Sequence, residues 1–193
     1  AGTLLSVILS LRDEFARLLC GSVAGDAEAR EEALFLAWSF GVSLAVAAPI
    51  YLCFRSLVES LNVRALSLTI AVLLSATALA SLIRPEHLPR LSVVKSALVL
   101  GLAQGLAVLP GVSRSGATIA ALMALGFAPE DAFRLSYMVA APAIACVVAY
   151  ELTIQGVLMT TEAVVALAVS ALVGALTIRA LLGVAKRVPR WVL

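Results

Sequence analysis

The stretch that decides the fold is LPGVSRSGATI, residues 109–119, which interrupts a long apolar region of the chain. Arg114 divides residues 96–129 into 18 uncharged residues before it and 15 after it. Fifteen is short of the roughly 20 apolar residues that a transmembrane helix needs. Two helices that meet at a polar break therefore predict a re-entrant helix-loop-helix hairpin at about residues 93–127, a form tolerated only where protein or water surrounds the break.

Uncharged stretches elsewhere predict membrane-spanning helices, because a charge in hydrocarbon costs several kcal/mol. Residues 33–54 and 65–83 contain 22 and 19 uncharged positions, and residues 135–150 and 163–178 contain 16 each. The last two stretches extend into apolar neighbours and reach spanning length. The apolar start, residues 1–11, is expected to be the end of a further helix.

The composition supports a membrane protein. Hydrophobic residues make up 62% and charged residues 13% of the 193 residues, and the mean hydropathy is +1.07. Ordinary soluble domains have about 45–50% and about 25%. The net charge of +2 does not suggest a nucleic-acid partner. Three scattered cysteines and the single His87 provide no metal-ligand spacing. We predict an all-α, polytopic protein forming one transmembrane domain over residues 1–193, with membrane lipids as its surroundings.

The basic residues orient this domain in the cell membrane. If the predicted segments alternate, eleven fall on one side: Arg12, Arg17, Arg30, Arg84, Arg90, Lys95, Arg134, Arg179, Lys186, Arg187 and Arg190. The other side receives only Arg55 and Arg64. The richer side is cytoplasmic by the positive-inside rule. The hairpin tip, with Arg114, is then expected to face an outward-open cavity. Arg12, Arg17 and Arg30 then lie in the first loop. The acidic residues Asp26, Glu28, Glu31 and Glu32 are expected in a solvated loop that leads into a helix.

The break itself combines helix-stopping residues with a new helix start. Pro110 is expected to end the first arm, because it has no N–H. Gly111 and Gly116 permit positive φ and close approach of a ligand. The second arm is expected to begin near Ser115, which places the positive end of its dipole at the break.

The polar groups at the break are hydrogen-bond donors. Ser113, Ser115 and Thr118 contribute hydroxyls, and Arg114 contributes a permanently charged guanidinium. This donor set suits a phosphate oxyanion. The alternative is that Arg114 pairs with a carboxylate and that the hydroxyls only cap a helix.

The first arm carries a GxxxG pattern at Gly101 and Gly105, which predicts close packing on a neighbouring helix. Gln104 lies between these glycines. It either reaches the phosphate site or bonds a neighbouring helix. Residues 40–53 also echo residues 133–146 in a Phe-Ser-Val-Ala-Ala-Pro-Cys pattern, as an internal repeat would.

Residues 110–119 match P-G-x-S-R-S-G-A-T-I at every fixed position. That pattern resembles the second signature of the undecaprenyl-pyrophosphate phosphatases, the bacitracin-resistance membrane proteins. The resemblance implies an enzyme that removes one phosphate from a polyprenyl diphosphate and regenerates the lipid monophosphate carrier of cell-wall synthesis. It also implies an inverted-repeat architecture, with a re-entrant hairpin in each repeat.

The resemblance also implies roles for the residues at the break. Arg114 would clamp the diphosphate, with Ser113 and Thr118 as its catalytic hydrogen-bonding partners. Ser115 and the amides near Gly111 and Gly116 would complete a cradle, to which Gln104 is a candidate addition. The resemblance implies a divalent cation, magnesium or calcium.

One family feature is missing. The family's first signature, which supplies acidic residues, a serine and a histidine, is absent from this sequence. We therefore expect a chain that lacks an N-terminal hairpin and a C-terminal span, and that is inactive or nearly so by itself. The alternative function is a non-hydrolytic polyprenyl-phosphate transporter or lipid-phosphate binding protein. A third interpretation is a purely structural subunit. A homodimer is considered as its assembly.

Overall fold

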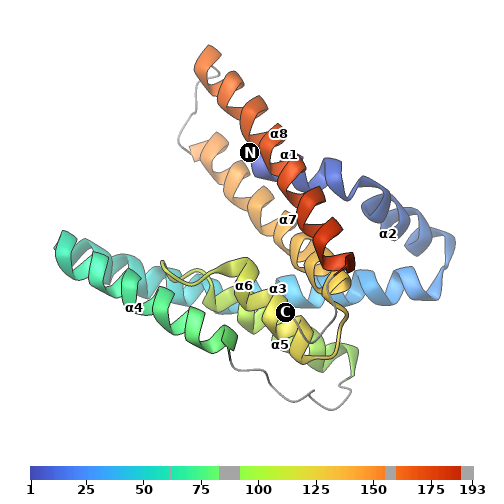
Figure 1. Ribbon diagram of the computed structural model, residues 1–193, viewed down its shortest axis with the longest axis horizontal. Coiled ribbons are helices and arrows are strands. Elements are labelled where there is room, and N and C mark those ends of the chain that lie inside the picture. The colour runs from blue at the N-terminus through green and yellow to red at the C-terminus, as the bar shows by residue number, and fades with distance from the viewer. Residues whose placement is uncertain (61, 83–91, 155–159, 188–193) are drawn as a thin grey trace. The chain divides into compact units, whose positions relative to one another are not determined.

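The computed structural model describes residues 1–60, 62–82, 92–154 and 160–187, and within these ranges the chain forms helices and no strand (Figure 1). The helices are α1 (Gly2–Ser10), α2 (Arg12–Ala24), α3 (Ala27–Ser60), α4 (Val63–Leu82), α5 (Val93–Leu106), α6 (Arg114–Ala124), α7 (Pro129–Ile154) and α8 (Thr161–Arg187). The predictions that involve Arg84, His87, Arg90 and Arg190 lie outside the described residues.

Three described helices are long and apolar enough to cross a membrane. The spanning stretches are Ala27–Phe54, Pro129–Thr153 and Thr161–Lys186. They coincide with three of the four predicted spans. The fourth prediction falls on α4, a helix whose described apolar stretch, Arg64–Leu79, is shorter. The all-helical membrane fold is therefore confirmed.

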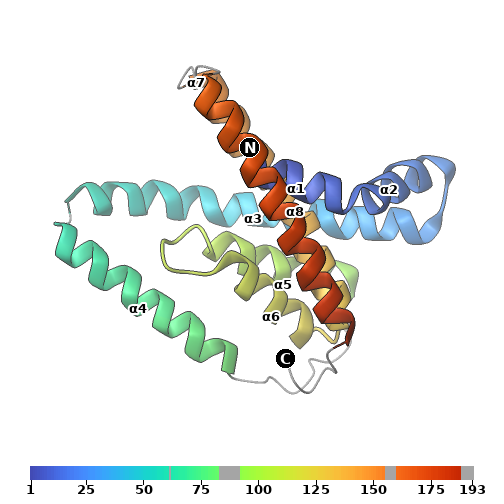
Figure 2. The ribbon, with the colours of Figure 1, turned by 45° about the horizontal axis from the view of Figure 1, so that its top comes forward.

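The helices form two compact units. The first contains residues 1–34 and 129–193, and the second contains residues 35–128. In the first unit α1 and α7 both pack against α8 (Figures 1 and 2). Small residues bring α1 close to α8, and the Ser6 hydroxyl donates a hydrogen bond of 2.9 Å to the Ala171 carbonyl.

In the second unit α5 packs on α3 through its two glycines. A Cβ atom at Gly101 would lie 2.6 Å from the Cβ of Val42, and one at Gly105 would lie 2.7 Å from the Cβ of Val46. Real Cβ atoms do not approach so closely, so only glycine fits at these two positions. The predicted close packing of the GxxxG pattern is confirmed.

The predicted loop that contains the basic and acidic residues between Arg12 and Glu32 is wrong, because these residues lie mostly in two helices. Helix α2 contains Arg12 and Arg17, and it ends at Gly25, which adopts φ +86°, the left-handed conformation that commonly ends helices. The Asp26 carboxylate then accepts a hydrogen bond of 3.0 Å from the Glu28 amide at the start of α3. Gly25 thus ends one helix and Asp26 caps the start of the next, so two helices form where the charge pattern alone indicated a loop.

An ion cluster joins α2, α3 and α7 within the first unit. The Arg134 Nη1 atom lies 2.6 Å from Oε1 of Glu32 and 3.3 Å from Oε2 of Glu14. Arg17 also bonds Glu32, whose hydrogen bond and charge raise the pKa of the Arg17 guanidinium above its usual value. The Glu32 side chain is only 16% exposed, so the expected solvated role of this residue is also wrong.

Candidate functional site

The hydrogen-bond pattern at the end of α5 changes from the α-helical one to tighter turns before the break. After Leu106 the chain continues in three-residue turns, in which the Val108 amide bonds the Gly105 carbonyl at 3.3 Å and the Leu109 amide bonds the Leu106 carbonyl at 3.2 Å. These hydrogen bonds end at the residue before Pro110, which has no N–H to continue them. The α-helix thus ends four residues before the proline, and one further turn of the same kind spans the proline, in which the Val112 amide bonds the Leu109 carbonyl at 3.1 Å.

Gly111 adopts φ +99°, so the predicted positive φ is confirmed there. A Cβ atom at this position would lie 2.7 Å from the Ile70 carbonyl oxygen of α4. The close approach that requires glycine is therefore made by a neighbouring helix. Gly111 fixes the break against α4.

Gly116 does not adopt the positive φ that glycine permits. Gly116 lies in the first turn of α6, and among the described residues positive φ occurs only at Gly25, Gly111 and Gly126. Its amide donates a hydrogen bond of 3.2 Å to the Ser113 hydroxyl oxygen. The helix begins before Gly116, which fixes its backbone in the right-handed conformation.

Helix α6 begins at Arg114, one residue before the predicted start. Ser113 is the N-cap, with extended backbone and a side chain that accepts from the Gly116 amide. The alternative interpretation, in which the hydroxyls cap a helix, is therefore confirmed for Ser113. A hydroxyl that accepts such a bond still has its own proton to donate to a ligand.

The remaining polar side chains of α6 differ in exposure. Ser113 and Ser115 are exposed, Arg114 is half-buried, and Thr118 is buried at 1% exposure. The Thr118 hydroxyl donates to the carbonyls of Arg114 at 2.9 Å and Ser115 at 3.2 Å. The roles of these four residues in binding remain predictions.

Gln104 bonds a neighbouring helix, the second of the two possibilities left open by the sequence. Its Nε2 atom donates a hydrogen bond of 3.2 Å to the Ser43 hydroxyl of α3, and both side chains are buried. Gln104 does not line the cavity described next. Its contribution to substrate binding stays a prediction.

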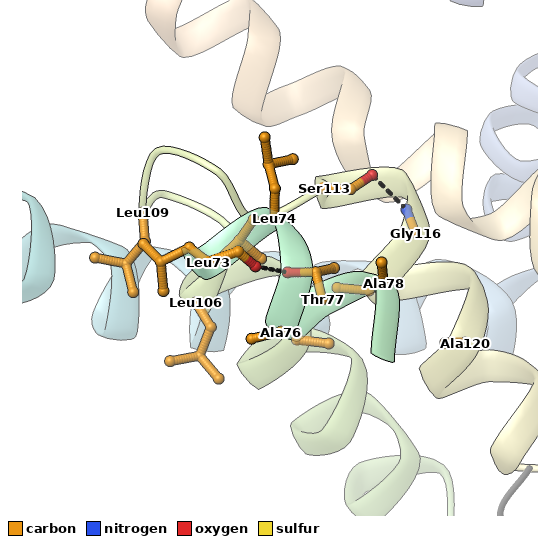
Figure 3. A pocket seen from close by; sticks show the side chains of 13 residues that line it. Leu73, Leu74, Ala76, Thr77, Ala78, Leu106, Leu109, Ser113, Gly116 and Ala120 are labelled. Carbon is orange, nitrogen blue, oxygen red and sulfur yellow. Dashed lines mark hydrogen bonds between the residues drawn. The ribbon is translucent and has the colours of Figure 1, made fainter. Parts of the chain in front are cut away.

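A cavity of about 700 Å³ lies beside the break in the second unit (Figure 3). It is lined by residues of α4, α5, the break and α6: Leu73, Leu74, Ala76, Thr77, Ala78, Ala103, Leu106, Leu109, Val112, Ser113, Gly116, Ala117 and Ala120. Ser113 and Gly116 thus belong both to the helix start and to the cavity wall. No pattern in the sequence indicated that α4 contributes to the cavity, because its apolar composition is that of any membrane helix.

The residues at the break do not by themselves suit a divalent cation. Residues 96–129 contain no Asp or Glu. Magnesium and calcium prefer carboxylate and carbonyl oxygens, whereas hydroxyl protons, amides and a guanidinium suit an anion. Among the described residues no group of three or more His, Cys, Asp or Glu is placed to hold a metal ion.

The fold and the break together define a class: a polytopic membrane protein with a helix-loop-helix whose second helix starts at an arginine. The chain belongs to the family described as "Bacitracin resistance protein BacA", whose model matches residues 1–192. It is a multi-pass integral membrane protein, and a location in the cell membrane fits its prokaryotic relatives.

Several relatives are named undecaprenyl-diphosphatase. The protein from Pyrobaculum aerophilum is 34% identical, and the match covers 96% of this chain and 72% of that protein. The protein from Saccharolobus islandicus is 36% identical over 74% of this chain and 52% of its own length. The protein from Haloarcula marismortui is 44% identical over 49% of this chain and 36% of its own length. The chain therefore spans between about a third and about three quarters of these relatives.

Proposed function

We propose that this protein hydrolyses a polyprenyl diphosphate, with undecaprenyl diphosphate as its substrate, and releases phosphate to regenerate the lipid monophosphate carrier for cell-wall synthesis. The name undecaprenyl-diphosphatase carried by its relatives supports this activity. The observation that carries the proposal is Arg114, the first residue of α6, at a break between apolar helices.

The break stabilises charge in this proposal. Hydrolysis splits the phosphoanhydride P–O–P bond, with water adding to one phosphorus and the bridging oxygen leaving on the lipid phosphate. Negative charge grows on that leaving oxygen. A guanidinium, which binds phosphate in a bidentate manner, and a helix N-terminus both favour this charge. Ser113 and Ser115, both exposed, donate hydroxyl hydrogen bonds to the same group.

We assign Arg114 and Ser113 to transition-state stabilisation. We assign Thr118, whose buried hydroxyl donates to the Arg114 carbonyl at 2.9 Å, to positioning Arg114 at the start of α6. The nucleophile and general base are assigned to no residue of this chain. The cradle is completed by Ser115 and the amides near Gly111 and Gly116. The divalent cation implied by the resemblance stays a prediction, and no step is derived through it. A homodimer stays a prediction in the same way.

We also propose that α5 and α6 form a re-entrant hairpin. Their 14 and 11 residues correspond to about 21 and about 17 Å of helix at 1.5 Å per residue. Each is shorter than the roughly 30 Å hydrocarbon core. With both ends on the basic, cytoplasmic side, the tip points outward. The inverted-repeat architecture is proposed on the resemblance.

The alternative, a non-hydrolytic transporter or lipid-phosphate binding protein, is not favoured, because the relatives carry the name of a hydrolase. The two functions differ in one measurement. A hydrolase releases inorganic phosphate from the lipid diphosphate, whereas a transporter or binding protein retains the lipid intact.

The test is phosphate release from undecaprenyl diphosphate by the purified protein that carries this chain. We expect Arg114→Ala to lower kcat/KM by about 100-fold or more, as loss of a transition-state donor does. Arg114→Lys keeps the charge but loses the bidentate fork, and we expect an intermediate loss.

The matched control is Arg179→Ala, which removes an exposed arginine of α8. We expect it to leave phosphate release unchanged. Wild-type rates in Arg114→Ala would contradict the assignment of Arg114, and absence of release from the wild-type protein would contradict the hydrolase.

A further inference from the structure

We propose that the cavity between α4, α5 and α6 holds the isoprenoid units next to the diphosphate of the lipid substrate. This inference rests on the proposed function and assigns a second part of the substrate to named residues. The small side chains of the cavity wall then determine which lipid chains the enzyme accepts.

The wall of the cavity is aliphatic over most of its extent. Leucines and alanines of three helices line it, and among the lining residues only Ser113 and Thr77 have polar side chains. The Thr77 hydroxyl donates a hydrogen bond of 2.7 Å to the Leu73 carbonyl inside α4, so its proton is already bonded within the helix. A polar ligand would lose its hydrogen bonds to water in such a space, whereas a hydrocarbon chain would lose none.

The polar groups at the start of α6 lie on one side of the cavity. Figure 3 shows Ser113 and Gly116 on one side of the cavity, joined by their hydrogen bond, and Leu106 and Leu109 on the other side. Ser113 and Gly116 form the start of α6, where the proposed phosphate cradle begins. A matching ligand has an anionic group at one end and a hydrocarbon chain attached directly to it.

A prenyl diphosphate meets this requirement. Its diphosphate is esterified to the first carbon of the chain, so a head group at the start of α6 leaves the first isoprenoid units within the cavity. A volume of about 700 Å³ falls in the range of roughly 300–1,000 Å³ that small-ligand sites occupy. The cavity therefore suits the first part of a long chain, and the rest extends into the bilayer.

Small side chains create the space. Ala76 on α4, Ala103 on α5 and Ala117 and Ala120 on α6 line the cavity. Ala76 and Ala120 are exposed, so a larger side chain at either position fills the cavity without displacing core residues. The two helices offer independent ways to block the same space.

The kinetic test compares Ala76→Phe with Ala71→Phe. Both alanines are exposed residues of α4, but Ala71 does not line the cavity. We expect Ala76→Phe to raise KM for a polyprenyl diphosphate by about tenfold or more, in line with the effect of small volume changes in apolar pockets, with kcat within about twofold. Ala71→Phe should leave both constants unchanged. Ala120→Phe is the second blocking variant, in case Ala76→Phe does not fold.

A diphosphate without an isoprenoid chain tests binding of the head group alone. For methyl diphosphate, which has no isoprenoid chain, we expect wild-type and Ala76→Phe to have equal kcat/KM. An equal loss for the short and the long substrate in both blocking variants would overturn the proposal, because the substitution would then act on the phosphate site.

A binding experiment keeps this proposal separate from hydrolysis. A non-hydrolysable prenyl bisphosphonate with a diazirine on its first isoprenoid unit is cross-linked to the protein, and the labelled peptides are identified by mass spectrometry. We expect labels within residues 73–78 or 117–120, reduced at least fivefold by Ala76→Phe and retained by Ala71→Phe.

Labels confined to other helices would overturn the proposal. A second result would also overturn it: Ala76→Phe loses a co-purified bilayer phospholipid, while labelling and KM stay unchanged. The cavity would then hold a bilayer lipid and not the substrate chain. A labelled cavity without phosphate release would contradict the proposed hydrolysis and leave this inference intact.

Discussion

At the scale of single residues, Gly111 determines the geometry of the break. Its φ of +99° is unfavourable for any residue with a side chain, and a Cβ atom there would collide with the Ile70 carbonyl. The turn that follows Pro110 and the approach of α4 both depend on this one glycine. Ser113, two residues later, caps the helix that begins at Arg114.

We predict that Gly111→Ala destabilises the protein by roughly 2–3 kcal/mol, because backbone strain and a steric clash act together. The measurement is denaturant unfolding in detergent micelles, combined with phosphate release, which should fall because the start of α6 moves. The matched control is Gly41→Ala in α3, where a Cβ atom meets nothing within 4 Å. It should be neutral or stabilising by up to about 1 kcal/mol. Equal stability of both variants would contradict the role of Gly111.

Some of these residue properties could be predicted from the sequence and others could not. Positive φ at Gly111 follows from its place after a proline and before a helix start. The conformation of Gly116 follows from the start of α6, which Ser113 decides by capping. Gly116 lies in the first turn whether α6 begins at Arg114, as observed, or near Ser115, as predicted, so its φ is negative in both cases. The partner of Gln104 could not be predicted, because Ser43 lies 61 residues away in the sequence.

At the scale of elements, long-range ion pairs hold α2, α3 and α7 of the first unit. Arg134 of α7 pairs with Glu32, 102 residues away in the sequence, and with Glu14 of α2. Their side chains are 18%, 16% and 37% exposed. The count of basic residues predicted the side of the membrane on which Arg134 lies, but it could not predict which carboxylates pair with it.

We predict that Arg134→Met destabilises the protein by about 2 kcal/mol, between the costs of breaking an exposed and a buried ion pair, because Glu14 and Glu32 lose a charge partner while Glu32 keeps Arg17. Thermal unfolding in detergent micelles measures the change. Lys186→Met is the control: Lys186 lies 3.2 Å from Glu130 in a pair whose side chains are 61% and 46% exposed. Its loss should cost less than about 1 kcal/mol. A cost at Arg134 as small as that at Lys186 would contradict the structural role of the cluster.

At the scale of the whole molecule, composition and charge-free stretches predicted the helical membrane fold, because the bilayer leaves helices as the simplest way to satisfy the backbone. Residues 110–119 predicted the family. The cavity beside the break could not be predicted, since it depends on how α4 packs on α6 and not on a local pattern. The helix α2 was missed for a different reason, since charged residues suit a polar helix as well as a loop.

The central claim is that the start of α6 binds the diphosphate of a polyprenyl lipid. The most direct measurement is an experimental structure of the protein with a non-hydrolysable undecaprenyl bisphosphonate, from which the distance between a phosphonate oxygen and the Arg114 guanidinium is read. We predict a hydrogen-bonding distance of about 2.7–3.2 Å, with the lipid chain entering the cavity of α4, α5 and α6. A head group bound elsewhere, with the Arg114 guanidinium paired to a carboxylate of the protein, would contradict the account.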